Sequence, residues 1–246
     1  MKKRFNSIFD IIGPVMVGPS SSHTAGAVRL AYLARWIFNE KPKKVIFYLY
    51  GSFAETYRGH GTDCALVGGM LGMRTDNPLI ASSMYIATEA GLEFSFIPLV
   101  DNAKHPNTVK IIMTSENGTK MSLEGRSVGG GNVELTKLDG LELSVFNGIS
   151  SLILIHRDTP GMIAKVSTIL GDQNINIATM KVERTQKGEE ASMVIELDQN
   201  THDVSLSKIR ALENVQRVIC IPKDLEEKEI YEGNWIEINE WFSGSC

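Results

Sequence analysis

SLILIHRDTPGMIAKVSTILGDQNINIATM, residues 151–180, decides the fold of the second half of the chain. The apolar run Leu152–Ile155 is typical of a buried strand, and apolar residues then recur at helical spacing from about Pro160 to Leu170. Asp158 stands where a helix N-cap is expected, with Pro160 near the first turn. The elements expected next are strand Ile175–Glu183, a turn at Lys187-Gly188, strand Ala191–Leu197, helix Val204–Leu212 and strand Val215–Ile221. The order βαββαβ predicts a ferredoxin-like sandwich.

The first half of the chain mixes helical and strand patterns. After His23, residues such as Ala27 and Leu30 share one face of a predicted helix, and Lys43–Tyr50 is typical of a buried strand. Two more helices are expected, at Asp63–Met70 and Pro78–Ala90, and two more strands, at Leu92–Val100 and Thr108–Thr114. The turn Glu116-Asn117-Gly118 should pair Val109–Thr114 with Lys120–Ser127 as a hairpin. Short strands are expected on both sides of Gly129-Gly130-Gly131, up to Val145. A mixed α/β domain is therefore expected.

Together these patterns predict an α+β protein with two domains and a tail. The mixed α/β domain would span residues 1–148, the ferredoxin-like domain 150–222 and an acidic tail 223–246. A length of 246 residues suits two compact domains. The tail carries Trp235 and Trp241, so it is either a solvated extension or a segment whose aromatic side chains pack on a neighbouring surface.

Composition narrows the function classes. No apolar run reaches the length of a membrane span, and the basic start MKKRF is followed by no signal-peptide cleavage pattern, so the cytoplasm is expected. A net charge of −4 disfavours a nucleic-acid partner. Cys64, Cys220 and Cys246 are irregularly spaced, which indicates a reducing compartment and neither a disulfide framework nor a metal motif. Cys64 and Cys220 are expected in the core, and no role is assigned to Cys246.

The segment GPSSSHTAG, residues 18–26, is a candidate anion site. The hydroxyls of Ser20, Ser21, Ser22 and Thr24 lie beside the N–H groups of a predicted helix start, where a small carboxylate would find several donors. His23 adds a group that titrates near neutral pH. The alternative is an ordinary N-cap in which one serine caps the helix and the others are spacers.

A second candidate loop, GHGTD, spans residues 59–63. His60 and Asp63 could act as an acid–base pair, and Thr62 could donate to an anion. Alternatively, Asp63 only caps a helix and the backbone satisfies His60. A metal site formed by His23, His60, Asp63 and His105 is also conceivable, but no spacing fixes a ligand geometry, so no metal is expected in this chain.

Four motifs in this order resemble the N-terminal part of iron-sulfur-dependent L-serine dehydratases. They are GPSSSHTAGA at 18–27, GHGTDCAL at 59–66, HPNTVKI at 105–111 and SVGGGNV at 127–133. The resemblance implies the β subunit of an L-serine ammonia-lyase, a lyase that converts L-serine to pyruvate and ammonia. It also implies that a partner α subunit holds the [4Fe-4S] cluster, which acts as a Lewis acid on the substrate hydroxyl.

The same resemblance implies roles for the two loops. The hydroxyls of Ser20, Ser21, Ser22, Thr24 and Thr62 would bind the substrate carboxylate, and His23, His60 and Asp63 would be catalytic. One histidine, His23 or His60, would assist proton movement. Asn107, Ser127 and Gly129–Gly131 are interpreted as structural, since they form a Pro-preset turn and a close backbone passage.

Residues 151–180 resemble the ACT domain, an amino-acid sensor. His156, Asp158 and Pro160-Gly161 match the ligand loop of serine-binding relatives, and Asn176 matches a later position. The N–H groups of Gly161 and Met162 would receive a carboxylate, while Asp158 and Asn176 would bind an ammonium. Such domains pair side by side, so a dimer of αβ units is expected. Asp158 departs from the asparagine of some relatives, which leaves the ligand open, and the module could serve dimerisation alone.

Two rival functions remain at this point. One is a stand-alone, non-catalytic amino-acid-binding regulator, which draws support from the same sensor motif. The other is a self-sufficient metal hydrolase built on His23, His60 and Asp63. Association with a cluster-bearing partner and the metal content of the isolated chain distinguish the three functions.

Overall fold

The computed structural model describes residues 15–100, 105–201, 204–223 and Leu225. Apart from Lys223 and Leu225, the predicted acidic tail with Trp235, Trp241 and Cys246 lies outside the described residues. The chain divides into two compact units between Glu134 and Leu135. The domain boundary near residue 149 stays a prediction.

The first sheet is built around strand β1 (Pro42–Tyr50). It pairs in parallel with β2 (Glu93–Pro98) and antiparallel with β3 (Thr108–Ser115), which pairs with β4 (Lys120–Gly129). Strands β5 (Asn132–Leu138) and β6 (Leu141–Phe146) complete the order β2-β1-β3-β4-β5-β6. Parallel and antiparallel pairs occur together, so the predicted mixed α/β character is confirmed.

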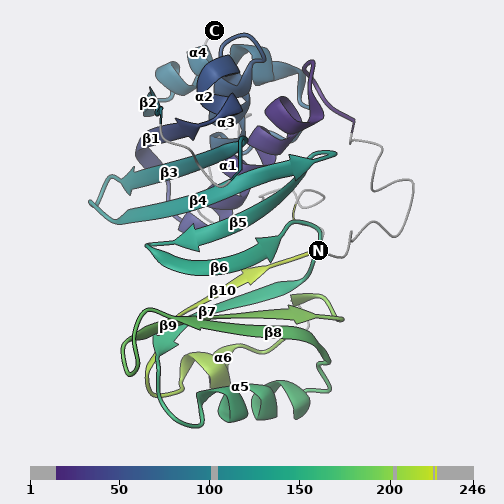
Figure 1. Cartoon of the computed structure of the whole chain (residues 1–246), viewed down its shortest axis with the longest axis vertical. Coiled ribbons are helices and arrows are strands. Elements are labelled where there is room, and N and C mark those ends of the chain that lie inside the picture. Colours follow the sequence, from purple (N-terminus) through teal and green to yellow (C-terminus); the bar gives the residue numbers. More distant parts are fainter. Residues whose placement is uncertain (1–14, 101–104, 202–203, 224, 226–246) are drawn as a thin grey trace, which may run out of the picture. The chain divides into compact units, whose positions relative to one another are not determined.

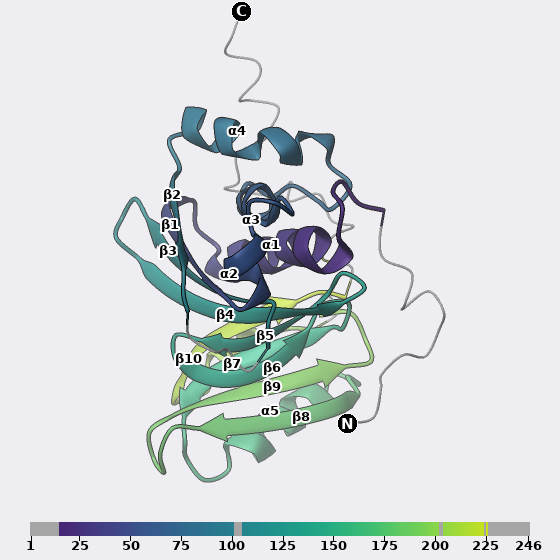
Figure 2. The same cartoon turned by 45° about the horizontal axis from the view of Figure 1, so that its top comes forward.

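The helices of the first unit lie on one face of its sheet (Figures 1 and 2). Helix α1 (Gly26–Phe38) packs on β3 and β4, α3 (Thr62–Met70) packs on α1, and α4 (Ser83–Glu89) packs on α3. The short helix α2 (Ser52–Thr56) contacts β1 and β2. This layering brings the starts of α1, α2 and α3 to the carboxyl end of β1.

Close packing of α1 on α3 depends on a glycine. A Cβ atom at Gly69 would overlap the carbonyl oxygen of Val28 and lie 2.9 Å from the Cβ of Ala31. Beside this contact the buried Arg35 donates from Nη1 to the carbonyl of Met70 at 2.5 Å. Burial lowers the pKa of Arg35 to about 10, so the guanidinium still carries its charge at neutral pH.

Several predicted elements of this unit are confirmed with changed ends. The hairpin forms around Asn117-Gly118, with Thr114 paired to Lys120. The helix expected over Pro78–Ala90 is divided into a 3₁₀ turn, η3 (Pro78–Ser82), and α4. Helix α2 was not predicted, because five residues are too short to show a periodic pattern.

The second unit has the predicted βαββαβ order. After β6, which the division also places in this unit, come β7 (Ser151–Arg157), α5 (Met162–Gly171), β8 (Ile177–Arg184), β9 (Glu190–Leu197), α6 (Ser207–Arg210) and β10 (Val215–Ile221). The strands run in the order β10-β7-β9-β8, and both helices cover one face of this sheet (Figure 1). Leu152, Leu154, Val166, Met193 and Ile195 belong to the core beneath them.

The predicted helix cap at Asp158 is wrong. The N-cap of α5 is Gly161, whose φ of 83° is the left-handed conformation that glycine adopts without strain, and the helix begins at Met162. The carboxylate of Asp158 instead accepts hydrogen bonds from Arg184 Nη1 at 2.8 Å and from the Gly188 amide at 3.2 Å. The hydrogen bond from Arg184 is the main reason why the pKa of Asp158 is lowered.

In the described part of the chain, no helix combines the length and the apolar character needed to cross a lipid bilayer.

Candidate functional site

The serine motif forms the entry to α1. Ser21–Ala25 make one π-helical turn, η2, that continues directly into the α-helix, and such turns are frequent at functional sites. Ser20 is the N-cap, and its Oγ accepts a hydrogen bond from the His23 amide at 3.2 Å. The predicted cap is therefore present. The hydroxyl of Ser21 has no hydrogen-bond partner among the described residues and remains available to a ligand.

The imidazole of His23 is surrounded by hydroxyl groups. Its Nδ1 lies 3.1 Å from Ser22 Oγ and 3.3 Å from Ser20 Oγ, and its Nε2 lies 2.9 Å from Ser52 Oγ. Ser52 is the first residue of α2 and was not predicted from the sequence. It directly follows Gly51 at the carboxyl end of β1, and that position was the available signal, because loops after parallel strands commonly line binding sites.

Two aromatic rings pack against His23. The ring of Phe53 meets it edge to face at a centroid distance of 5.5 Å, and the ring of His60 does so at 4.8 Å. Partial burial, and secondly the charge that His60 would carry, lower the pKa of His23 below its usual value. The ring is therefore neutral at pH 7, with one nitrogen able to accept a proton.

The second motif comes to the same place. Thr24 Oγ1 donates to the carbonyl of His60 at 3.3 Å and so ties the serine motif to the GHGTD loop. Thr62 is fully buried, and its hydroxyl and the buried Nδ1 of His60 have no hydrogen-bond partner in the described part of the chain. Buried polar atoms without partners are uncommon and costly, so both are candidates for contact with a bound molecule.

Asp63 is bonded locally. Its Oδ1 accepts a hydrogen bond from the amide of Cys64 at 2.8 Å in the first turn of α3. No hydrogen bond joins Asp63 to His60 among the described residues, so the acid–base pair stays a prediction.

The HPN and SVGGG motifs support the two loops. A Cβ at Gly51 would lie 2.7 Å from the carbonyl oxygen of Pro106, and the amide of Phe53 donates to that oxygen at 3.3 Å. A Cβ at Gly26 would overlap Ser127, whose own amide donates to the carbonyl of Asn107 at 3.0 Å. These contacts agree with the predicted structural role of both motifs.

The same two motifs also carry unpaired polar atoms. The buried Oδ1 of Asn107 and Oγ of Ser127 have no hydrogen-bond partner in the described part of the chain. Nearby, burial and then the Arg126 guanidinium lower the pKa of His105, although Glu134 opposes the shift.

The first unit thus brings the serine motif to His60 and Thr62, and Ser52 completes the arrangement. Among the described residues no three His, Cys, Asp or Glu side chains gather as metal ligands. Cys64 and Cys220 are free thiols, and burial is the main reason why the pKa of each is raised, to about 11 for Cys220. Neither has the reactive, deprotonated character of a ligand or nucleophile.

The residues proposed for the sensor do not gather within one chain. Asp158 is held by Arg184 at the end of β8, whereas Asn176 precedes Ile177 at the start of that strand. The eight residues of β8 give seven steps of about 3.3 Å, so its two ends lie about 23 Å apart. Asn176 Nδ2 donates to Asp198 Oδ2 at 2.5 Å, while His156 is buried with Nδ1 near its own chain, 2.8 Å from the Arg157 carbonyl.

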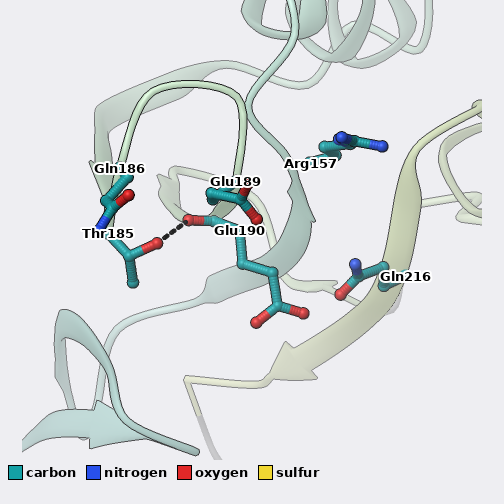
Figure 3. Close-up of a pocket in the computed structure, with 6 residues that line it drawn as sticks. All are labelled: Arg157, Thr185, Gln186, Glu189, Glu190 and Gln216. Carbon is teal, nitrogen blue, oxygen red and sulfur yellow. Dashed lines mark hydrogen bonds between the residues drawn. The ribbon is translucent and has the colours of Figure 1, made fainter.

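An open groove of about 650 Å³ lies in the second unit (Figure 3). It is lined by Arg157, Thr185, Gln186, Glu189, Glu190 and Gln216. All six residues are exposed, and water and salt screen charges in such a position. The groove contains neither of the two predicted loops nor the sensor residues.

Comparison with known proteins gives consistent similarities. The family model described as "Serine dehydratase beta chain" matches residues 7–95, and the "ACT domain" model matches residues 150–214. The chain is 44% identical to the "Probable L-serine dehydratase, beta chain" of Bacillus subtilis (strain 168), covering 89% of this chain and 99% of the relative. It is 37% identical to the "L-serine dehydratase, beta chain" of Peptoniphilus asaccharolyticus, covering 84% and 94%.

A more distant similarity covers part of the chain. The "D-3-phosphoglycerate dehydrogenase" of Methanocaldococcus jannaschii is 35% identical over 118 residues, which are 48% of this chain and 22% of that protein.

Proposed function

Because this chain belongs to the L-serine dehydratase beta chain family and carries an ACT domain, we propose that it provides one wall of an active site completed by a cluster-bearing alpha chain. The reaction is the conversion of L-serine to pyruvate and ammonia. The irregularly spaced Cys64, Cys220 and Cys246 suit a reducing compartment, so the reaction is assigned to the cytoplasm.

The observation that carries the proposal is the His23 ring held among hydroxyls beside His60. L-Serine has a carboxylate that needs hydrogen-bond donors, and the hydroxyls of Ser21 and Thr62 are free to donate. Ser20 and Ser22 add two further hydroxyls next to the ring. Thr24 already donates to His60, so its oxygen serves as an acceptor.

Loss of water from L-serine removes the α-proton and the β-hydroxyl, and the resulting aminoacrylate takes up water to give pyruvate and ammonia. The [4Fe-4S] cluster of the partner would supply a Lewis acid for the hydroxyl. The residues of this chain would bind the carboxylate and move protons. His23, neutral at pH 7, can accept one, and the unpaired Nδ1 of His60 offers a second position. Asp63 would support the charge that His60 gains.

The second unit is proposed to bind a small amino acid between two copies of the chain. Strand β8 forms one edge of its sheet. If two copies pair their β8 strands antiparallel about a two-fold axis, the start of one strand lies beside the end of the other. Asn176 of one copy then approaches Asp158, His156 and the start of α5, at Gly161 and Met162, of the other. A dimer of αβ units would result.

Co-expression tests the enzymatic proposal. The full chain should co-purify with a cluster-bearing alpha chain, and the anaerobic complex should release pyruvate from L-serine. Ser21→Ala and His60→Ala should lower turnover by about tenfold or more without changing the unfolding temperature. Thr88→Ala, on the exposed side of α4, is the matched control.

Other results would contradict the proposal. If the chain binds L-serine but neither associates with the alpha chain nor raises its deamination activity, the stand-alone regulator is the better function. Stoichiometric zinc in the isolated chain would favour the metal hydrolase.

A further inference from the structure

Ser52 makes a contact with the site that neither motif contains. Its Oγ lies 2.9 Å from Nε2 of His23, 29 positions earlier in the chain. Because Ser20 and Ser22 face the other nitrogen, Nδ1, the ring is held from two opposite sides by different parts of the chain. Phe53, the neighbour of Ser52, packs edge to face on the same ring.

A neutral imidazole has one N–H group and one lone pair. Its two nitrogens therefore need one acceptor and one donor, and the partner of Nε2 determines what Nδ1 can do. Among the described residues Ser52 is the partner of Nε2, whereas Nδ1 has a choice between Ser20 and Ser22. Among the described residues Nε2 is also the only hydrogen-bond partner of Ser52 Oγ, so this hydroxyl donates to Nε2 and leaves the proton of the neutral ring on Nδ1.

Ser52 itself is held firmly. Gly51 has a φ of 53°, and a Cβ atom there would lie 2.7 Å from the Pro106 carbonyl oxygen. The backbone conformation before Ser52 is therefore restricted to one that glycine adopts. Phe53 donates its amide to the Pro106 carbonyl at 3.3 Å, and Thr56 Oγ1 donates to the Ser52 carbonyl at 2.7 Å. The hydroxyl is thus presented to His23 from a fixed backbone.

We propose that Ser52 is a positioning residue that fixes the tautomer and the orientation of His23, leaving Nδ1 directed at the serine motif. The kinetic consequence rests on the proposed function, because there His23 moves a proton next to the substrate carboxylate. The structural consequence, a single ring tautomer, does not rest on it.

Two variants of Ser52 that match each other in shape, one with a hydroxyl and one without, separate the effect of the hydroxyl from that of side-chain shape. Ser52→Thr keeps the hydroxyl, and Ser52→Val has the same shape without it. Ring nitrogen chemical shifts of His23, measured by ¹⁵N NMR on the full chain near pH 7.5, report the tautomer directly. Turnover of L-serine is measured in parallel on the complex with the alpha chain, with Glu55→Gln, an exposed change on the same helix, as control.

We expect one tautomer in the wild type and in Ser52→Thr, and a mixture or the opposite tautomer in Ser52→Val. The kcat of Ser52→Val should fall by about ten- to a hundredfold against Ser52→Thr, with a smaller change in KM. An unchanged His23 tautomer in Ser52→Val would overturn the inference. Equal kcat of the two variants in an active complex would overturn its kinetic part, whereas an inactive wild-type complex would count against the proposed function alone.

Discussion

At the scale of single residues, burial determines the protonation of His23. Transfer of the imidazole from water disfavours its charged form, and the neighbouring His60 disfavours it further. The unfolded chain therefore binds a proton more readily than the native chain over the pH range just below 6.5. In that range the unfolding free energy must rise with pH, since stability rises wherever the unfolded state holds more protons.

This leads to a prediction for His23→Gln. Removing the titrating group should flatten the dependence of the unfolding free energy on pH between about 5 and 7, by less than about 1.4 kcal/mol per pH unit. Urea unfolding of the full chain at a series of pH values measures the slope. Lys187→Gln, a change at an exposed turn residue far from His23 in the sequence, should leave it unchanged. A steeper slope in His23→Gln would contradict the burial argument.

Individual residues of the site were predictable to different degrees. The hydroxyls and histidines stood out because their motifs are compact in sequence. Ser52 did not, because its meeting with His23 depends on how β1 ends and how α1 packs. The lack of hydrogen-bond partners at the buried polar atoms of Thr62, Asn107 and Ser127 could not be predicted from the sequence either, since burial is a property of the folded chain.

At the scale of elements, the contact between α1 and α3 positions the two loops, because α1 follows the serine motif and α3 follows GHGTD. At this contact the backbones of the two helices lie next to each other. Gly69 faces Val28 with no room for a Cβ atom, whereas a Cβ at its neighbour Gly68 would reach Ile80 and Met73 at 3.4 Å, close to ordinary contact.

The two glycines give a matched pair of variants. Gly69→Ala should destabilise the chain by about 1–3 kcal/mol, as overpacking does in well-filled cores. Gly68→Ala should be close to neutral, because the helical preference of alanine, worth up to about 1 kcal/mol, offsets its tight contacts. Thermal or urea unfolding of both variants measures the difference. Equal stability would mean that α1 can move away from α3 at little cost.

Elements were predictable where local chemistry agreed with the tertiary structure. The hairpin at Asn117-Gly118 and the βαββαβ order follow from turn residues and periodicity. The cap at Asp158 failed because a left-handed Gly161 starts the helix instead, and the carboxylate pairs with Arg184 on a strand far along the chain. Sequence spacing carries no signal of such a partner.

At the scale of the whole molecule, the proposed dimer depends on the edge strand β8. Adjacent residues of an edge strand point their amides in opposite directions, one into the sheet and one outward. Proline at the outward position removes the donor needed by a second copy and leaves the sheet of its own chain intact.

Lys181 and Val182 are adjacent on β8, so the amide of one points into its own sheet and the amide of the other points outward. Lys181→Pro and Val182→Pro therefore test the two directions. The variant that keeps the wild-type unfolding temperature should lose the dimer, which sedimentation of the full chain or the complex would show as a halved mass. The same proline variant should show no heat of L-serine binding in calorimetry, and neither should Asn176→Ala. Gln186→Ala, in the open groove, is the control and should retain the binding heat. A dimer and full binding in that proline variant would place the contact elsewhere.

The close approach of Gly51 to the backbone of Pro106 limits which residues of this chain can be varied in a mutant library. In a library randomised over residues 50–53, nearly every clone that replaces Gly51 would be lost before its chemistry could be assayed, since a side chain there meets backbone and not a yielding neighbour. The same library should yield folded clones with other residues at Ser52, so their effect on turnover can be measured. Useful diversity around His23 is thus concentrated in one codon, and the codon before it should be held constant.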